Sequence, residues 1–386
     1  MTKIDYKNTI SELFDLTTFS NNPANSVHTL LMGKKIFLYG VGSGFSTFSV
    51  FILEKYGFKA EAVFDLRFKT NTTYFTIPAF SPLSYTPTDD EKENAIVVIT
   101  VGKAEYHKEI FACLHNLGFK NIILATDIYE YHLHYTPKEI ENKGHVYYLN
   151  NKEYIMNSFN LFSDDLSCRI FINILQTYLQ KRIFTIPHRP LQEQYFPKDI
   201  KLSKGYTRFV NCGAYNGDTI MKLNALVGKV DAVACFEPCI ASFGLLSQYL
   251  CAEHKKIAKS IVAFPCAVFS HETQLHFTSS AKSNNSLSAD GDITVQCVAL
   301  DHVIPNFKPT SINMDIEGAE LEALKGAETL IKENKPDLAI SIYHRSSHLW
   351  EVPRYLQSLN LGYRYYLRNY TSFISETILY ATAPGR

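Results

Sequence analysis

A glycine-bracketed turn is the stretch of this chain whose residue types and spacing best suit chemistry. The run Phe209-Val-Asn-Cys-Gly-Ala-Tyr-Asn-Gly-Asp-Thr219 predicts a buried strand, then a turn bracketed by Gly213 and Gly217, then a helix. Ligands of open α/β sheets bind at the carboxyl ends of strands, and glycine lets the backbone approach a ligand closely. We expect a cofactor here, with the backbone N–H groups of Tyr215 to Thr219 near a carboxylate. The alternative is a turn that only packs a helix on a strand.

Glu237 is the second candidate for chemistry. It follows a predicted strand at 230–236 and lies 20 residues beyond Gly217. A carboxylate in this place can accept hydrogen bonds from two ribose hydroxyls. A surface glutamate that only stabilises the start of the next helix is the alternative. The turn and the acid together favour the cofactor.

Acidic residues also gather at the end of another predicted strand, 311–315. Asp315 and Glu317 are candidates for holding the amino group of a cofactor, binding a metal or acting as a base. For Glu320 we expect only charge complementarity to a helix N-terminus. His344 ends the strand at 338–343, where an imidazole is a plausible general base near neutral pH; a loop histidine without a role is the alternative.

The bulk properties exclude several classes of protein. The 386 residues carry 38 Lys and Arg against 38 Asp and Glu, which disfavours a general nucleic-acid binder. No apolar stretch is long enough to span a bilayer, and the N-terminus lacks the apolar segment of a signal peptide. None of the 8 cysteines forms a C-x-x-C pair. We therefore expect the cysteines to act as small buried apolar residues in a reducing compartment. These features predict a soluble, cytoplasmic protein.

The element pattern predicts two α/β domains, because strands alternate with helices in two parts of the chain. We divide the chain into a helical lead-in (1–33), an α/β domain (34–135), a helical connector (136–200) and a second α/β domain (201–386). The first domain should have strands at 36–40, 60–65, 95–100 and 121–126, and helices at 45–56 and 108–117. The second should have further strands at 207–212 and 261–268, a hairpin at 275–277 and 293–298, helices at 320–334 and 350–359, and an antiparallel pair at 363–367 and 377–380.

The first α/β domain carries a weaker version of a nucleotide motif. Gly40-Val-Gly-Ser-Gly-Phe45 resembles a dinucleotide fingerprint, although Phe45 occupies the last glycine position. Asp65 ends the next strand, where a ribose-binding acid would lie. A scaffold or subunit-contact domain, through which the chain forms a homo-oligomer, explains these residues equally well.

Residues 207–382 resemble the FkbM family of S-adenosylmethionine-dependent methyltransferases. Four motifs in order carry the resemblance: the run 209–219, Phe236-Glu-Pro238, Val298-Ala-Leu-Asp301, and Met314-Asp-Ile-Glu-Gly-Ala-Glu320 with Leu324-Lys-Gly-Ala327. The resemblance implies a class I (Rossmann-like) seven-stranded methyltransferase domain, here preceded by a smaller Rossmann-like α/β domain. It also implies methylation of a hydroxyl on a sugar, such as a surface glycan precursor, or on a small natural product. Asn211 stands where the family commonly has Asp, which puts an ionic role there in doubt.

The resemblance also assigns roles to the candidate residues. Residues 215–219 should frame the methionine part of S-adenosyl-L-methionine, and Glu237 its ribose. Proton removal falls to Asp315 or His344, no metal ligands are assigned, and the polar loop 279–286 is a candidate lid. Two alternatives stay open: a non-catalytic protein that binds a nucleotide sugar or a cofactor, and an NAD-dependent oxidoreductase that uses the N-terminal domain. The full cofactor-binding set is Asn211, Gly213, Tyr215, Asn216, Gly217, Asp218, Thr219, Glu237, Pro238 and Glu317.

Overall fold

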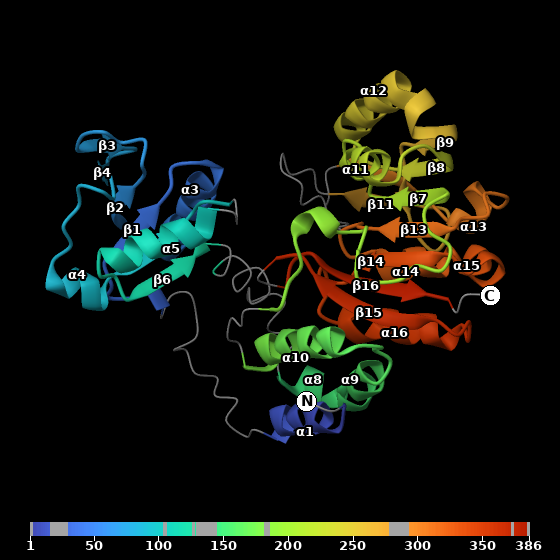
Figure 1. Ribbon diagram of the computed structural model, residues 1–386, viewed down its shortest axis with the longest axis horizontal. Coiled ribbons are helices and arrows are strands. Elements are labelled where there is room, and N and C mark those ends of the chain that lie inside the picture. The colour runs from blue at the N-terminus through green and yellow to red at the C-terminus, as the bar shows by residue number, and fades with distance from the viewer. Residues whose placement is uncertain are drawn as a thin grey trace. The chain divides into compact units, whose positions relative to one another are not determined.

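The computed structural model describes residues 3–15, 30–102, 106–125, 128, 145–180, 186–277, 293–371 and 374–383. The chain forms two compact units, which are described separately (Figure 1). One comprises Thr17–Tyr147 with Leu179–Ile183, and the other comprises Met1–Leu16, Tyr148–Tyr178 and Phe184–Arg386. Within the described ranges, none of the helices has both the length and the apolar character that crossing a membrane requires.

The first unit is built on a six-stranded sheet in the order β3-β4-β2-β1-β5-β6. The pairs β1–β2, β1–β5 and β5–β6 are parallel, as the alternation of strands and helices predicts. The hairpin of β3 and β4 was not expected from the sequence. The elements are β1 (Ile36–Tyr39), α3 (Ser43–Phe48), the π-helical η2 (Ser49–Glu54), β2 (Ala60–Phe64), β3 (Thr72–Tyr74), β4 (Ile77–Phe80), α4 (Asp89–Asn94), β5 (Ile96–Ile99), α5 (His107–Asn116) and β6 (Asn121–Leu124).

The second unit is built on a seven-stranded sheet in the order β15-β16-β14-β13-β7-β8-β9. Strand β16 runs antiparallel to both neighbours, so the predicted antiparallel edge pair is confirmed. The expected Rossmann-like α/β fold is confirmed as well. The strands of this sheet are β7 (Arg208–Cys212), β8 (Val230–Phe236), β9 (Ala258–Phe264), β13 (Ser311–Met314), β14 (Asp337–Ser341), β15 (Arg364–Asn369) and β16 (Thr377–Thr382).

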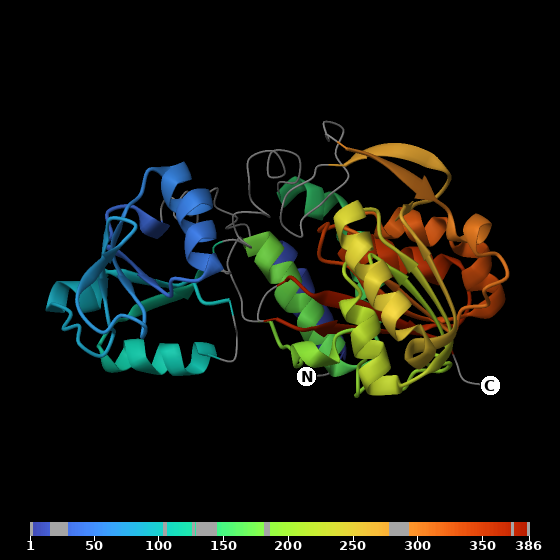
Figure 2. The ribbon, with the colours of Figure 1, turned by 90° about the horizontal axis from the view of Figure 1, so that it is seen from above.

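Helices cover both faces of this sheet. Figure 2 shows α11 and α12 on one side and α14, α15 and α16 on the other. All residues of β13 and β14 are buried as a result, the polar Asn313 and Asp337 among them. The helices are α11 (Asp218–Val227), α12 (Ile240–Ile257), α13 (Leu300–Val303), α14 (Glu320–Lys325), α15 (Glu328–Asn334) and α16 (His348–Ser358).

The single helix expected over 320–334 is wrong, because α14 and α15 are separate helices. The break lies at Gly326, where an added Cβ would be 2.0 Å from the carbonyl oxygen of Phe269. The α15 helix then begins against Asp301, whose carboxylate accepts the N–H groups of Thr329 and Leu330. A tertiary contact therefore divides a segment whose local pattern is helical.

The predicted hairpin is confirmed. Strands β11 (Thr273–Phe277) and β12 (Ile293–Val298) pair antiparallel, and the short β10 (Ala267–Val268) extends them to a three-stranded sheet. The candidate lid, 279–286, falls outside the described residues.

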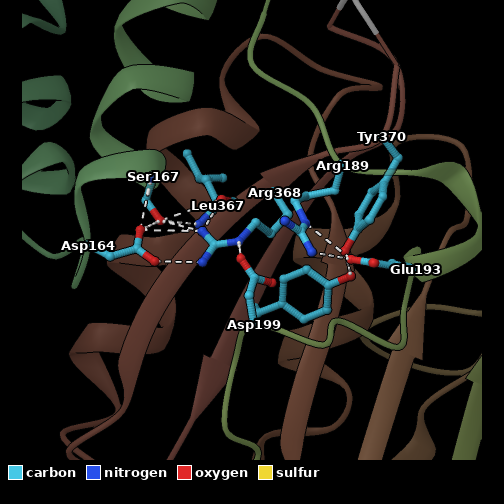
Figure 3. Close-up of polar contacts among 9 residues, drawn as sticks. Asp164, Ser167, Arg189, Glu193, Asp199, Leu367, Arg368 and Tyr370 are labelled. Carbon is cyan, nitrogen blue, oxygen red and sulfur yellow. Dashed lines mark hydrogen bonds and ion pairs between the residues drawn. The ribbon is translucent and has the colours of Figure 1, made fainter.

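A buried arginine ties the segment before β7 to the edge of the seven-stranded sheet (Figure 3). Arg368 on β15 is 2% exposed, and its guanidinium donates to Asp164 at 2.6 Å and to Asp199 at 2.8 Å. Ser167 on α10 donates to Asp164 and accepts from the N–H of Leu367. The elements of this segment and of the N-terminus are α1 (Lys3–Asp15), α8 (His145–Asn150), α9 (Lys152–Phe159), α10 (Asp165–Gln180) and the 3-10 helix η4 (Leu191–Glu193).

Candidate active site

The turn between β7 and α11 lies against the end of β13. Gly213 has a φ of 81°, and a Cβ there would lie 1.9 Å from the carbonyl oxygen of Asp315. Glycine is therefore required at this position by backbone conformation and by space. The close approach brings the glycine turn and the acidic cluster after β13 to the same edge of the sheet.

Glu237 fastens this turn to the end of β8. One oxygen of its carboxylate accepts the N–H of Tyr215 and the other accepts the N–H of Cys239, each at 2.8 Å. Glu237 is only 7% exposed, so the alternative that it is a surface glutamate is wrong. Burial raises the pKa of Glu237, and the two backbone N–H groups oppose that shift. Each oxygen keeps a second lone pair that can accept from a ligand.

Most N–H groups of the turn already have hydrogen-bond acceptors within the turn or at the end of β8. Tyr215 donates to Glu237, Gly217 donates to the carbonyl of Ala214 at 2.8 Å, and Thr219 donates to the carboxylate of Asp218 at 2.6 Å. The Asp218 N–H lies 3.3 Å from the side-chain oxygen of Asn216. These bonds give the turn a fixed shape, and they leave few donors for the anion that the sequence suggests.

Asn211 lies inside the sheet rather than at its edge. It is fully buried and faces Asn313 across β7 and β13, and its Oδ1 accepts from Nδ2 of Asn313 at 2.9 Å. Pro238 follows Glu237 directly and is partly exposed. Asn211 therefore joins two central strands through a buried side-chain hydrogen bond.

Two tyrosines hold the carboxylate of Asp315. Tyr195 donates to Oδ2 at 2.5 Å, and Tyr343 donates to Oδ1 at 3.3 Å. Tyr195 comes from the segment before β7 and has a φ of 65°, a strained conformation for a bulky residue. Burial and the charge of Asp315 raise the pKa of Tyr195 well above its usual value, so it stays a donor. Nothing in the local sequence marks Tyr195 as part of the site.

Glu320 and His344 form a buried ion pair. Glu320 is 0% exposed, and its Oε1 accepts from Nδ1 of His344 at 2.8 Å and from the N–H groups of Ile316 and Gly318. Its Oε2 lies 3.3 Å from Nδ1 of His348. The expectation that Glu320 only complements a helix N-terminus is therefore wrong, because its carboxylate is the centre of a side-chain cluster.

The other ring nitrogen of His344 points toward two carboxylates. Nε2 lies 3.5 Å from Oδ1 of Asp315 and 3.5 Å from Oε2 of Glu317. Burial would lower the pKa of His344, but Glu320, Asp315 and Glu317 outweigh burial and raise it to about 10. Burial raises the pKa of Glu317 to about 7, and the charge of His344 opposes that shift.

The structure thus brings Asp315, Glu317 and His344 together, with the unpredicted partners Glu320 and Tyr195 beside them. Asp315, Glu320 and His344 each offer a ligand atom, and these atoms lie within 4.8 Å of one another. The cluster adjoins the glycine turn through the contact of Gly213 with Asp315. A nucleotide-like ligand and a reacting group therefore have neighbouring places at one sheet edge.

Comparison with known families decides the type of domain. Residues 211–365 match the model described as the methyltransferase FkbM domain. These residues are an FkbM methyltransferase domain. The match contains the glycine turn, Glu237, the acidic cluster and His344.

A solved structure of similar fold covers nearly the whole chain. The crystal structure of methyltransferase FkbM from Methylobacillus flagellatus KT covers 98% of this chain and 100% of its own, with 22% identity and a TM-score of 0.69. At that identity the likeness concerns the fold alone. No curated protein matches the sequence.

Two other solved structures are more distant. An rRNA methylase from Streptococcus thermophilus covers 51% of this chain and 92% of its own, with 17% identity and a TM-score of 0.30. Fibrillarin from Aeropyrum pernix, in complex with S-adenosyl-L-methionine, covers 50% of this chain and 74% of its own, with 9% identity and a TM-score of 0.29. Neither likeness is close enough to carry an argument.

In the first unit, the candidate ribose-binding acid is engaged by neighbours. The carboxylate of Asp65 accepts the N–H of Val41 at 3.0 Å, and both its oxygens accept from the guanidinium of Arg67 at 2.9 Å. Phe45, at the last glycine position of the motif, is buried and packs its ring against Tyr74 at 5.1 Å. Asp65 and Phe45 therefore have structural contacts within this unit: Asp65 holds the turn at Val41 and pairs with Arg67, and Phe45 packs on Tyr74.

Proposed function

We propose that the FkbM domain binds S-adenosyl-L-methionine and transfers its methyl group to a hydroxyl of a sugar or a small natural product. One observation carries the proposal: Glu237 is fixed by two backbone N–H groups beside a glycine turn at the carboxyl ends of β7 and β8. The residues fit a cofactor with a diol, because a carboxylate held in place can accept two hydroxyl hydrogen bonds without reorganising. The residues we assign to the cofactor are the ten named from the sequence, with Asn211 acting through Asn313.

The reaction needs little from the protein beyond alignment and proton transfer. When bound, S-adenosyl-L-methionine supplies a methyl group on a sulfonium, and its transfer to a hydroxyl yields a methyl ether, S-adenosylhomocysteine and one proton. We assign Asp315 to receive that proton, since its carboxylate is 26% exposed and is held by the two tyrosines. His344 lies at the same centre, with its Nε2 3.5 Å from a carboxylate oxygen of Asp315 and 3.5 Å from one of Glu317.

The rest of the chain has supporting roles in this proposal. Residues 201–386 form the catalytic module, 136–200 form a connector that braces it, and 34–135 form a scaffold or subunit-contact domain. We propose a cytoplasmic location, since all eight cysteines are free thiols. We do not propose nicotinamide chemistry, because Asp65 is already paired with Arg67.

Calorimetry with S-adenosyl-L-methionine tests the cofactor assignment. Glu237→Gln removes the charge and turns one acceptor oxygen into a donor. We expect binding about ten- to a hundredfold weaker, since a hydrogen bond to a charged group contributes about 1.5–3 kcal/mol. Glu253→Gln, at an exposed ion pair with Lys256 on α12, is the matched control and should bind normally. Equal affinity of the two variants would overturn the role of Glu237.

A further inference from the structure

The unpaired nitrogen of His344 is the feature that this proposal leaves unexplained. The side chain of His344 is 9% exposed, and its Nε2 has no hydrogen-bond partner among the described residues. A buried imidazole nitrogen without a partner is costly unless a ligand completes it. Nε2 is directed at the oxygens of Asp315 and Glu317, both at 3.5 Å.

The other side of the ring is arranged as it is in metal-binding histidines. A metal-ligating histidine usually donates its second N–H to a carboxylate, which fixes the tautomer and strengthens the ligand. Here Nδ1 donates to Glu320 at 2.8 Å, and Glu320 is itself held by the N–H groups of Ile316 and Gly318. The lone pair of a neutral imidazole would then lie on Nε2, facing the two carboxylates.

We propose that His344 Nε2, Asp315 Oδ1 and Glu317 Oε2 bind a divalent cation beside the cofactor pocket, with Glu320 as the carboxylate that orients the histidine. Two carboxylate oxygens and one imidazole nitrogen suit a hard, oxygen-preferring ion that accepts one imidazole, such as Mn²⁺. Two ligands held about 2.1 Å from one ion at a right angle lie about 3.0 Å apart. Nε2 lies 3.5 Å from each of the two carboxylate oxygens, which is within about half an ångström of that spacing.

Charge and access agree with this site. Three carboxylates surround one histidine, those of Asp315, Glu317 and Glu320. One imidazole cannot neutralise three carboxylates, so negative charge remains for a cation to offset. Asp315 and Glu317 are 26% and 34% exposed, so an ion and an acceptor hydroxyl can reach them from solvent. In the methyl transfer proposed above, on which this role rests, the cation would acidify the acceptor hydroxyl, and Oδ2 of Asp315, which is not a ligand of the cation, would take the proton.

Manganese binding to the full chain without S-adenosyl-L-methionine tests the site. Titration with MnCl₂, followed by electron paramagnetic resonance, should give one site with nitrogen hyperfine coupling. Glu317→Gln and His344→Gln should each weaken binding at least about tenfold, as losses around metal sites do, and His344→Gln should also remove the nitrogen coupling. Circular dichroism checks that each variant folds, and the partly exposed Glu317 gives a variant that spares the buried ion pair.

The control is His302→Gln, which removes an exposed imidazole that pairs with the single carboxylate of Glu272. It should leave Mn²⁺ binding unchanged. The site would be overturned if the wild type bound no Mn²⁺ at millimolar concentration. It would also be overturned if Glu317→Gln and His344→Gln bound Mn²⁺ as tightly as the control His302→Gln. Calorimetry with S-adenosyl-L-methionine in EDTA separates the two proposals: cofactor binding without Mn²⁺ binding refutes only the metal site.

Discussion

Glu320→Gln tests whether this buried glutamate centres a side-chain cluster or only complements a helix terminus. The wild-type carboxylate accepts two backbone N–H groups and the Nδ1 of His344, and it lies near His348. A helix-terminal charge contributes about 0.3–1 kcal/mol. Removing one partner of a buried, hydrogen-bonded ion pair costs about 3–5 kcal/mol. The two interpretations therefore predict losses of unfolding free energy that differ severalfold.

We expect the larger loss, which corresponds to a melting temperature lowered by roughly 6–20 °C for a unit of this size. Scanning calorimetry and urea unfolding of the full chain measure it, with the transition of the second unit followed by the fluorescence of the buried Trp350. Glu322→Gln, two residues along the same helix, is the matched control, because its partly exposed carboxylate pairs with Lys325 at the surface. It should change the unfolding free energy by less than about 1 kcal/mol. Similar small losses in both variants would refute the buried cluster.

Three further outcomes follow from the fold. Gly213→Ala should unfold the turn or abolish cofactor binding, measured by calorimetry, because its Cβ would lie 1.9 Å from a carbonyl oxygen of Asp315; normal binding would contradict that contact. Arg368→Met should destabilise the second unit by about 3 kcal/mol in urea, since Asp164 and Asp199 lose their buried partner. Burial would raise the pKa of Asp164, but Arg368 and Ser167 lower it. The stabilisation that ionised Asp164 gives is therefore present above pH about 4 and is lost as the pH falls through the lowered pKa. In Asp164→Asn, the unfolding free energy should depend less on pH in this acid range.

The strands and the glycine turn could be predicted because their signals are local. Segments rich in apolar residues mark β7, β8 and β14, and glycine, acid and strand order fix where the turn and Glu237 fall. The antiparallel edge pair and the inserted hairpin, both confirmed, are also visible as pairs of short strand-like segments in the sequence. Each of these features is encoded by residues that lie near one another in the sequence.

The parts that could not be predicted depend on distant contacts. Tyr195 reaches Asp315 across 120 residues, from a segment with no motif. The pairing of Asn211 with Asn313 spans 102 residues, and it exists only because β7 and β13 are neighbours. The helix break at Gly326 likewise depends on Phe269, which local propensity cannot register.

Methyl transfer by the full chain can be measured directly. The full chain is incubated with S-adenosyl-L-methionine carrying a deuterated methyl group and a panel of sugars and small natural products, with and without Mn²⁺. Mass spectrometry then follows the acceptors and S-adenosylhomocysteine. We expect the labelled methyl on an acceptor oxygen, with equal formation of S-adenosylhomocysteine and loss of both in Asp315→Asn. Tight binding of S-adenosyl-L-methionine without S-adenosylhomocysteine from any acceptor would indicate a binding protein and contradict the account.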